Sequence, residues 1–205
     1  MNKTLEIGSI YQFANIDWRV LDIQNNKALL ISEKILEKRP YNVEYEDITW
    51  EKCNLREYLN GEFYNKLGTA KSAISETRNS NPNNPWYETL GGNATTDKVF
   101  LLSLDEVCRY FGDSTTELRN VRKDDWYFSD KNNPNRIAKD GNQNACWWWL
   151  RSLGYNSFTA AVVDDDGFVY VRGFIVFNDS GGVRPALWLN LDFATHITLP
   201  INHKV

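Results

Sequence analysis

The sequence predicts a single α+β domain, and three observations support this fold class. Strand-like segments fill residues 7–32, two capped helix starts stand in the middle of the chain, and residues 146–191 are rich in strand-forming residues. A chain of 205 residues with 42% hydrophobic residues can bury one substantial core. We therefore expect one domain over residues 1–205, with two short helices, a central antiparallel sheet in 146–191 and long loops.

Residues 7–32 have the pattern of a β-meander. Three segments rich in β-branched, aromatic and aliphatic residues, Ile10–Phe13, Trp18–Ile23 and Lys27–Ser32, are separated by asparagines. Asparagine tolerates the left-handed backbone conformation that tight turns need. We expect turns at Asn15 and at residues 25–26.

Two helices are predicted from capping-box patterns. Asn54 with Glu57, and Ser103 with Glu106, each place a capping side chain three residues before a glutamate. We expect Asn54 to be the N-cap of the first helix and residues 60–61 to end it, with a second helical piece over 62–67.

The remaining middle of the chain is polar. Residues 33–48 are polar and interrupted by Pro40, and residues 76–97 and 112–145 are rich in Asn, Asp, Pro and Gly, which favours loops in all three segments. Residues 99–102 read VFLL and predict a short apolar strand. Trp86, within the long loop 76–97, is costly to expose, so we expect this loop to fold back onto the domain.

The C-terminal third is organised by residues 147–188. Residues 162–171 predict a β-hairpin with a turn at Asp166 and Gly167. On a strand, Trp147 and Trp149 would point to one face and Trp148 to the other. The run is either an aromatic floor beneath a binding site or, as we favour, packed core.

The charge of the chain argues against two classes of partner. The net charge is −4 and the pI is about 5.3, whereas nucleic-acid and anionic-membrane binders need a basic face. No apolar run is long enough to insert into a membrane. The N-terminal residues lack a signal-peptide pattern, so we expect a cytoplasmic protein by default, with a phage particle or the cell surface reached by another route.

The sequence offers no candidate for catalysis, a metal or a cofactor. Cys53, Cys108 and Cys146 are far apart, and His196 and His203 lie in the tail. No pair has metal-ligand or redox spacing, so buried free thiols are expected. We therefore expect a protein that is not an enzyme and has no cofactor.

Two further motifs have a structural and a functional interpretation. Arg151 and Arg184 lie in apolar segments, and an arginine there either pairs with a carboxylate and caps carbonyls, which we favour, or contacts an anionic ligand. Residues 164–167 read DDDG, which suggests calcium, but adjacent acids alternate in direction on a strand. A hairpin turn with solvated acids is favoured.

Residues at turns and outward positions of 155–180 form the candidate ligand-binding surface. They combine aromatic side chains with small polar ones, the composition that antibody loops use. By contrast, Val162, Val169 and Val171 are expected in the core. The candidates are Tyr155, Asn156, Ser157, Phe158, Phe168, Tyr170, Arg172, Phe174, Ile175, Phe177, Asn178 and Ser180.

The order of several motifs resembles a family of bacterial and phage-borne domains of unknown function. These motifs are WRVL at 18–21, LLIS at 29–32, FLLS at 100–103, WLRS at 149–152 and GVRPALW at 182–188. The ending also resembles C-type-lectin-fold domains of the formylglycine-generating-enzyme type. Those enzymes use two cysteines near the C-terminal part of the domain, whereas here Cys146 stands alone.

Variable proteins of diversity-generating retroelements share the C-type lectin fold. The resemblance implies that a reverse transcriptase rewrites adenines near the 3′ end of the gene. Asn codons rewritten in this way cannot encode Lys, Glu, Gln, Met or Trp, and residues 155–187 contain none of these five types. Average composition would supply about six. Strand propensity, which disfavours Lys and Glu, is the competing explanation.

These observations lead to one leading hypothesis and two alternatives. The leading hypothesis is a ligand-binding protein whose scaffold, residues 1–154 and 182–191, displays a variable surface at 155–180. Its expected ligand is a protein or surface macromolecule. The alternatives are a fixed-partner structural domain of the same fold and, less favoured, an oxidase of the formylglycine-generating-enzyme type. The oligomeric state and the ligand's identity do not follow from the sequence.

Overall fold

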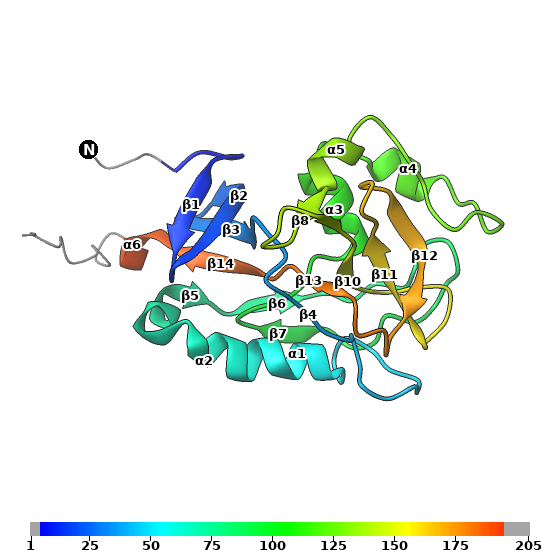
Figure 1. The fold of residues 1–205 in the computed structure, drawn as a ribbon, viewed down its shortest axis with the longest axis horizontal. Helices are drawn as coiled ribbons and strands as arrows, with labels where there is room; N and C mark the ends of the chain where they lie inside the picture. The colour runs from blue at the N-terminus through cyan, green and yellow to red at the C-terminus, as the bar shows by residue number, and fades with distance from the viewer. Residues whose placement is uncertain (1–4, 195–205) are drawn as a thin grey trace, which may run out of the picture.

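The computed structural model describes residues 5–194, and two five-stranded sheets dominate it (Figure 1). In the first sheet the predicted meander forms one edge and a C-terminal strand joins it, with every neighbouring pair antiparallel. Its order is β1 (Ile10–Phe13), β2 (Ile16–Gln24), β3 (Lys27–Ser32), β14 (Ala186–Asn190) and β5 (Ile74–Ser75).

The second sheet contains the predicted hairpin at one edge. Its strands pair antiparallel except for one parallel pair, β10 with β13. Its order is β12 (Val169–Ile175), β11 (Thr159–Val163), β10 (Trp148–Leu153), β13 (Gly182–Val183) and β4 (Glu37–Lys38). Two small hairpins complete the strands: β6 (Thr77–Asn79) with β7 (Thr95–Asp97), and β8 (Ala138–Lys139) with β9 (Ala145–Cys146).

The helices are short and lie around the sheets (Figure 1). They are α1 (Asn54–Tyr58), a π-helical turn (Leu59–Phe63), α2 (Tyr64–Lys66), a 3₁₀ segment (Gly68–Ala73), α3 (Leu104–Tyr110), α4 (Thr115–Arg119), α5 (Asn133–Arg136) and α6 (Leu191–Ala194). The α+β class is therefore confirmed. The segment 146–191 does not form one central sheet, however, because β14 leaves the second sheet and joins the first.

The meander and the second capping box follow the prediction. Turn residues Asn15, Asn25 and Asn26 have positive φ angles of 60°, 49° and 57°. The Ser103 hydroxyl accepts from the backbone N–H of Glu106, and the Glu106 carboxylate accepts from that of Ser103. Strand turns and capping boxes depend on residues close in sequence, so local patterns can identify them.

The first helix differs from its prediction at both ends. Its N-cap is Cys53, whose Sγ accepts from the N–H of Arg56, while Asn54 instead accepts from the N–H of Val43 at 3.0 Å. Asn60 does not end the helix, because its side chain accepts from the N–H of Lys98 at 2.7 Å and donates to the carbonyl of Val99 at 2.9 Å. The helix continues through the π-helical turn to Lys66.

Residues 99–102 are buried as expected but do not form a strand of either sheet. Phe100 makes a single bridge to Ala186, and all four side chains are 0–1% exposed. Their burial explains the apolar run, because a buried linker and a buried strand have the same composition.

Five fully buried tryptophans pack the core: Trp18, Trp50, Trp86, Trp148 and Trp149. Each indole N–H has a hydrogen-bond acceptor, which buried tryptophan requires. Trp86 donates to the carbonyl of Leu118 at 2.8 Å, so the loop 76–97 folds back onto the domain as predicted. The buried apolar residues form one continuous cluster.

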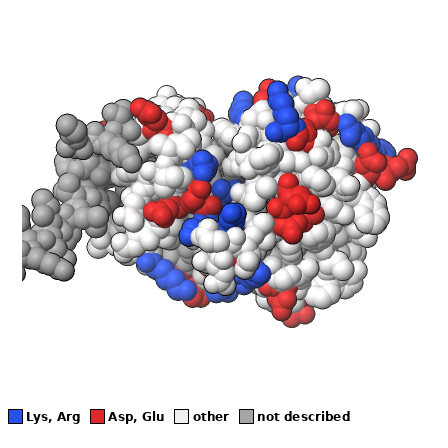
Figure 2. Space-filling view, turned by 45° about the horizontal axis from the view of Figure 1, so that its top comes forward, with Lys and Arg blue, Asp and Glu red and all other residues white. Residues whose placement is uncertain are grey.

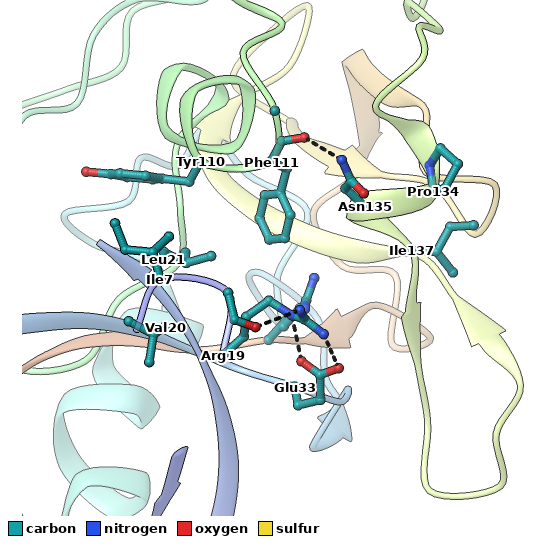
Figure 3. A pocket seen from close by; sticks show the side chains of 13 residues that line it. Ile7, Arg19, Val20, Leu21, Glu33, Tyr110, Phe111, Pro134, Asn135 and Ile137 are labelled. Atoms are coloured by element: carbon teal, nitrogen blue, oxygen red, sulfur yellow. Dashed lines mark hydrogen bonds and ion pairs between the residues drawn. The ribbon is translucent and has the colours of Figure 1, made fainter. Parts of the chain in front are cut away.

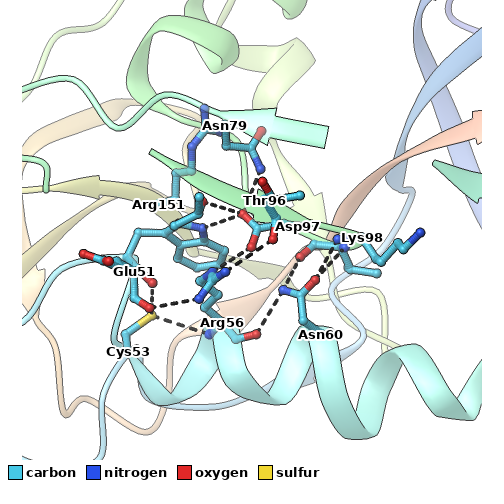
Figure 4. Close-up of polar contacts among 12 residues, drawn as sticks. Glu51, Cys53, Arg56, Asn60, Asn79, Thr96, Asp97, Lys98 and Arg151 are labelled. Atoms are coloured by element: carbon cyan, nitrogen blue, oxygen red, sulfur yellow. Dashed lines mark hydrogen bonds and ion pairs between the residues drawn. The ribbon is translucent and has the colours of Figure 1, made fainter. Parts of the chain in front are cut away.

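Asp97 is a buried carboxylate that joins α1 to the β6–β7 hairpin (Figure 4). One carboxylate oxygen accepts from Nε of Arg56 at 2.6 Å. The other accepts from the indole of Trp50 at 3.1 Å, from Asn79 at 2.9 Å and from Thr95 at 2.7 Å. This set of donors compensates for the desolvation of the charge.

We expect Asp97→Asn to destabilise the protein by about 3–5 kcal/mol, because it leaves Arg56 without its partner in a buried network. Urea denaturation measures the change in free energy of unfolding. Glu62→Gln, which removes the exposed ion pair with Lys66, is the control and should leave the midpoint unchanged. An equally small effect of both variants would contradict a stabilising role for Asp97.

Candidate ligand-binding surface

The β11–β12 hairpin holds the predicted surface at the edge of the second sheet (Figure 1). Gly167 supplies the turn with a φ of +79°. Val169 and Val171 on β12 are 0% exposed, as is Val162 on β11, whereas Phe168, Tyr170 and Arg172 are partly exposed. The alternation predicted for this strand is therefore present.

None of the twelve candidate residues is buried. Tyr155, Ile175 and Phe177 are 42%, 46% and 47% exposed, which is high for large apolar side chains. The loop from Tyr155 to Phe158 joins β10 to β11, as expected. Phe174 and Ile175 still belong to β12, and the connection after it runs through Phe177, Asn178 and Ser180.

A row of stacked aromatic rings runs along β12. Tyr127 stacks on Phe168 with ring centroids 5.1 Å apart and on Tyr170 at 5.3 Å. Tyr170 also contacts Phe174 at 5.1 Å, and Phe174 meets Trp147 edge-on at 4.9 Å. Trp147 therefore lies at the end of the row, while Trp148 and Trp149 belong to the core.

Arg172 lies between two exposed aromatic rings. Its guanidinium carbon is 4.7 Å from the ring centroid of Trp126 and 4.5 Å from that of Tyr155. The backbone N–H of Arg172 also donates to the carbonyl of Trp126 at 2.9 Å. Cation–π contacts on both sides restrict the conformations of the long Arg172 side chain, so a partner that contacts its guanidinium group loses little conformational entropy.

A second aromatic group forms at the other end of the surface. Tyr45, 63% exposed, stacks on Phe158 with centroids 4.9 Å apart and meets Phe177 edge-on at 5.5 Å. Asp47 accepts a short hydrogen bond from the hydroxyl of Ser157. The segment 33–48 therefore contributes to the surface from the far end of the chain.

Two shallow pockets open on this surface. One, of about 530 Å³, is lined by Phe174, Ile175, Phe177, Asn178 and Asp179. The other, of about 540 Å³, lies between Tyr155 and the loops that carry Asp47 and Leu90. Both volumes lie within the range of small-ligand sites, although open pockets suit larger partners equally well.

Carboxylates surround the aromatic residues. Asp179 lines the first pocket and Asp47 the second. Asp164 begins the hairpin turn, where burial and then the neighbouring acids Asp165 and Asp166 raise its pKa. As predicted, the acids at 165 and 166 are exposed at a turn. The surface is thus aromatic at its centre and acidic at its edge.

Charge elsewhere is mixed. On the face shown in Figure 2, lysines and arginines are interspersed with acids and form no continuous basic surface. No helix within residues 5–194 is long and apolar enough to cross a membrane.

The backbone under the surface is held by the long loop 76–97. The buried amide of Asn84 donates to the carbonyls of Leu153 and Val171, both at 2.9 Å. These carbonyls belong to β10 and β12, at the edges of the aromatic surface. The loop is therefore a support for the sheet, and its length does not indicate a mobile lid.

Three residues of the surface do not follow from the sequence prediction: Tyr45, Trp126 and Tyr127. All three lie in polar segments that were assigned as loops. The available signal was the presence of large aromatic residues beside acids, as in the DDWY run at 124–127. Such residues are either buried or used for contact, and here they are 63%, 50% and 41% exposed.

Arg151 and the three cysteines, further residues for which a function was considered, are part of the buried structure. Arg151 pairs with both oxygens of the Glu106 carboxylate and donates to the carbonyl of Leu101, which confirms its predicted structural role. The three cysteines are buried and free, as expected. Burial raises the pKa of both Cys53 and Cys108 to about 12. His196 and His203 lie outside the described residues.

A family model described as a domain of unknown function (DUF6273) matches residues 25–191. The chain belongs to this family. The match covers β3 to β14 and all twelve candidate residues, so the family includes strands of both sheets and the surface on the second. The expected membership in a domain family of unknown function is thereby confirmed. No curated protein and no solved structure matches the chain.

We expect Phe168→Ser to cost less than about 1 kcal/mol of stability, because solvent already reaches this side chain. Val169→Ser, one position further along the chain, should cost about 2–4 kcal/mol, because it leaves a cavity and buries a hydroxyl. Thermal and urea unfolding of the two variants measure the difference. A loss for Phe168→Ser as large as that for Val169→Ser would make Phe168 a core residue.

We expect iodoacetamide at pH 8 to leave Cys53 and Cys108 unmodified in the folded protein, because only the thiolate reacts and burial disfavours it. Peptide mass spectrometry with and without 6 M guanidinium, about the concentration that unfolds most domains, locates the modified thiols. Rapid labelling of either cysteine without denaturant would contradict the assigned burial.

Proposed function

We propose that this protein binds a protein or other surface macromolecule through the aromatic surface on β12 and its flanking loops, without a cofactor and without catalysis. The observation that carries the proposal is the alternation on β12. Its inward residues are fully buried in the core, while its outward residues leave aromatic rings and an arginine partly exposed to solvent. Exposed aromatic clusters of this kind are typical of interaction sites.

The chemistry of the surface narrows the partner. Stacked rings offer rigid apolar contact at a small cost in conformational entropy. The acidic edge, including Asp47, Asp164 and Asp179, favours a partner with basic or hydrogen-bond-donating groups and disfavours nucleic acid. We infer a partner patch that is apolar at its centre and basic around it.

The proposal includes a C-type-lectin-type scaffold whose surface is diversified by a retroelement. Two observations support diversification: the absence of Lys, Glu, Gln, Met and Trp from 155–187, and the finding that none of the twelve candidates is buried. A diversified position must tolerate many side chains, and exposed positions do so. Residues 1–154 and 182–191 would be the invariant scaffold.

Two alternatives make other requirements of the chain. A structural domain with a fixed partner would keep the same aromatic residues at 168, 170 and 174. An oxidase of the formylglycine-generating-enzyme type needs a second cysteine near Cys146, and Cys53 and Cys108 are both buried. No specific feature of the surface favours catalysis.

Deep sequencing of the 3′ end of the gene across a host population tests the proposal. We expect substitutions in the codons of Phe168, Tyr170 and Arg172, at the nucleotide positions that derive from adenines of the retroelement's template, with Val169 and Val171 unchanged in the same strand. The buried valines are internal controls, because both sets of codons lie in one short stretch of gene. An invariant stretch would contradict diversification and favour a fixed partner, and equal variation at inward and outward positions would contradict selection for a surface.

A further inference from the structure

A further cavity lies away from the aromatic surface, between the first sheet and the end of α3 (Figure 3). Its volume is about 330 Å³. In Figure 3 the ring of Phe111 points from the end of α3 toward the pair formed by Arg19 and Glu33. Arg184, from the segment that joins the two sheets, forms part of the wall.

Arg184 is a buried cation with incomplete hydrogen bonding. Its side chain belongs to a residue only 2% exposed, and Nε donates to the carbonyl of Ser32 at 2.9 Å. The guanidinium carbon lies 5.0 Å from the ring centroid of Trp148 and 5.3 Å from that of Phe111. Nη1 has no partner, and it is the only such buried side-chain nitrogen or oxygen within residues 5–194.

The other two buried arginines of the described chain show what Arg184 lacks. Arg151 has the carboxylate of Glu106. Arg136 has the carboxylate of Asp130 at 2.7 Å, and its remaining nitrogens donate to Ser114 and to the carbonyl of Gly167. A buried guanidinium without a carboxylate is costly, and the same burial lowers the pKa of Arg184 to about 10.

Nearby acceptors are already used. The carboxylate of Glu33 forms two hydrogen bonds with Arg19, at 2.5 and 2.9 Å. At the end of α3, the carbonyl of Phe111 accepts from Asn135 at 3.4 Å and that of Gly112 from Asn132 at 2.8 Å. The carboxylate of Glu33 acts on Arg184 electrostatically, but no carboxylate within the described residues forms an ion pair with Arg184. The cavity that Arg184 lines is therefore the place where such a partner can bind.

The charges and walls of the cavity define the ligand. Two arginines and one glutamate line it, which leaves one positive charge in excess. The other residues that line it include the apolar side chains Ile7, Leu21, Phe111, Pro134 and Ile137. One excess charge suits a monoanion better than a phosphate group, and planar guanidinium groups match carboxylates in geometry.

We propose that this cavity binds a small-molecule monocarboxylate, whose carboxylate pairs with Arg184 and whose apolar body lies against Phe111 and Ile137. This site is independent of the aromatic surface, which lies on the hairpin β11–β12. It gives Arg184 the second of the two roles open to a buried arginine, contact with an anionic ligand.

Titration with benzoate tests the proposal, with benzamide as the neutral molecule of the same shape and inorganic phosphate as the competing anion. Binding is measured by calorimetry and by the change in the NMR signal of the Arg184 Nε–H group. This signal is assigned as the one that is missing from the spectrum of Arg184→Lys. We expect benzoate to bind and to shift that signal, and neither benzamide nor phosphate to do so at the same concentration.

Two variants separate binding from stability. Arg184→Lys should weaken the binding of benzoate at least about tenfold, because a lysine ammonium cannot form the two parallel hydrogen bonds that a guanidinium forms with a carboxylate. Glu33→Gln, at a partly exposed position, should increase the affinity for benzoate at least about threefold, because it removes a negative charge beside the site. Glu33→Gln keeps the test valid if Arg184→Lys does not fold. Phe168→Ser, on the aromatic surface, should leave benzoate binding unchanged.

Several results would overturn the proposal. Phosphate binding in place of benzoate would overturn the ligand class, and equal binding of benzamide would show that charge is not recognised. No benzoate binding to the wild-type protein would overturn the site itself. Weakening by Glu33→Gln would place the anion elsewhere. None of these results bears on the aromatic surface, whose test is the variation of its codons.

Discussion

The passage of one chain segment from the second sheet to the first is the constraint on which the rest of the structure depends. Residues 182–183 pair with β10 and β4, and three residues later β14 pairs with β3 and β5. Between them, Arg184 donates to the carbonyl of Ser32, and the N–H of Ser32 donates to the carbonyl of Pro185. This short connection couples the registers of both sheets, so neither can shift alone.

Because the two sheets are fixed relative to each other, the backbone at the β12 edge can hold partly exposed aromatic residues in place. Trp148 and Trp149 fill the space beside the crossing segment, and Trp147, one residue earlier, ends the row of exposed rings. Asn84 holds the backbones of β10 and β12 from beneath. The exposed rings therefore rest on a backbone fixed by buried contacts, and they can change with little effect on folding.

Much of the fold and site could be predicted because it depends on residues close in sequence. Examples are the asparagine turns of the meander, the capping box at Ser103 and the alternation of Val169 and Val171 with Phe168 and Tyr170. Predictions were wrong where a distant residue competed for a polar group. The side chain of Asn54 accepts a hydrogen bond from the N–H of Val43 and does not cap its own helix. The side chain of Asn60 accepts one from the N–H of Lys98, just after β7, and the helix continues past it. No local pattern contains such partners.

The sequence by itself determined the α+β class, the strands of the meander and the outward side of the β11–β12 hairpin, because periodicity and turn residues act over short distances. The short strands β4 and β6 to β8 lie in segments predicted as loops. Only the tertiary structure decided which aromatic residues of the loops join the surface and which arginine lacks a partner. Tyr45 lies over a hundred positions from Phe158, and Arg151 and Arg184 look alike in sequence. Their difference is that folding brings Glu106 to the first, whereas Glu33 near the second is already paired with Arg19.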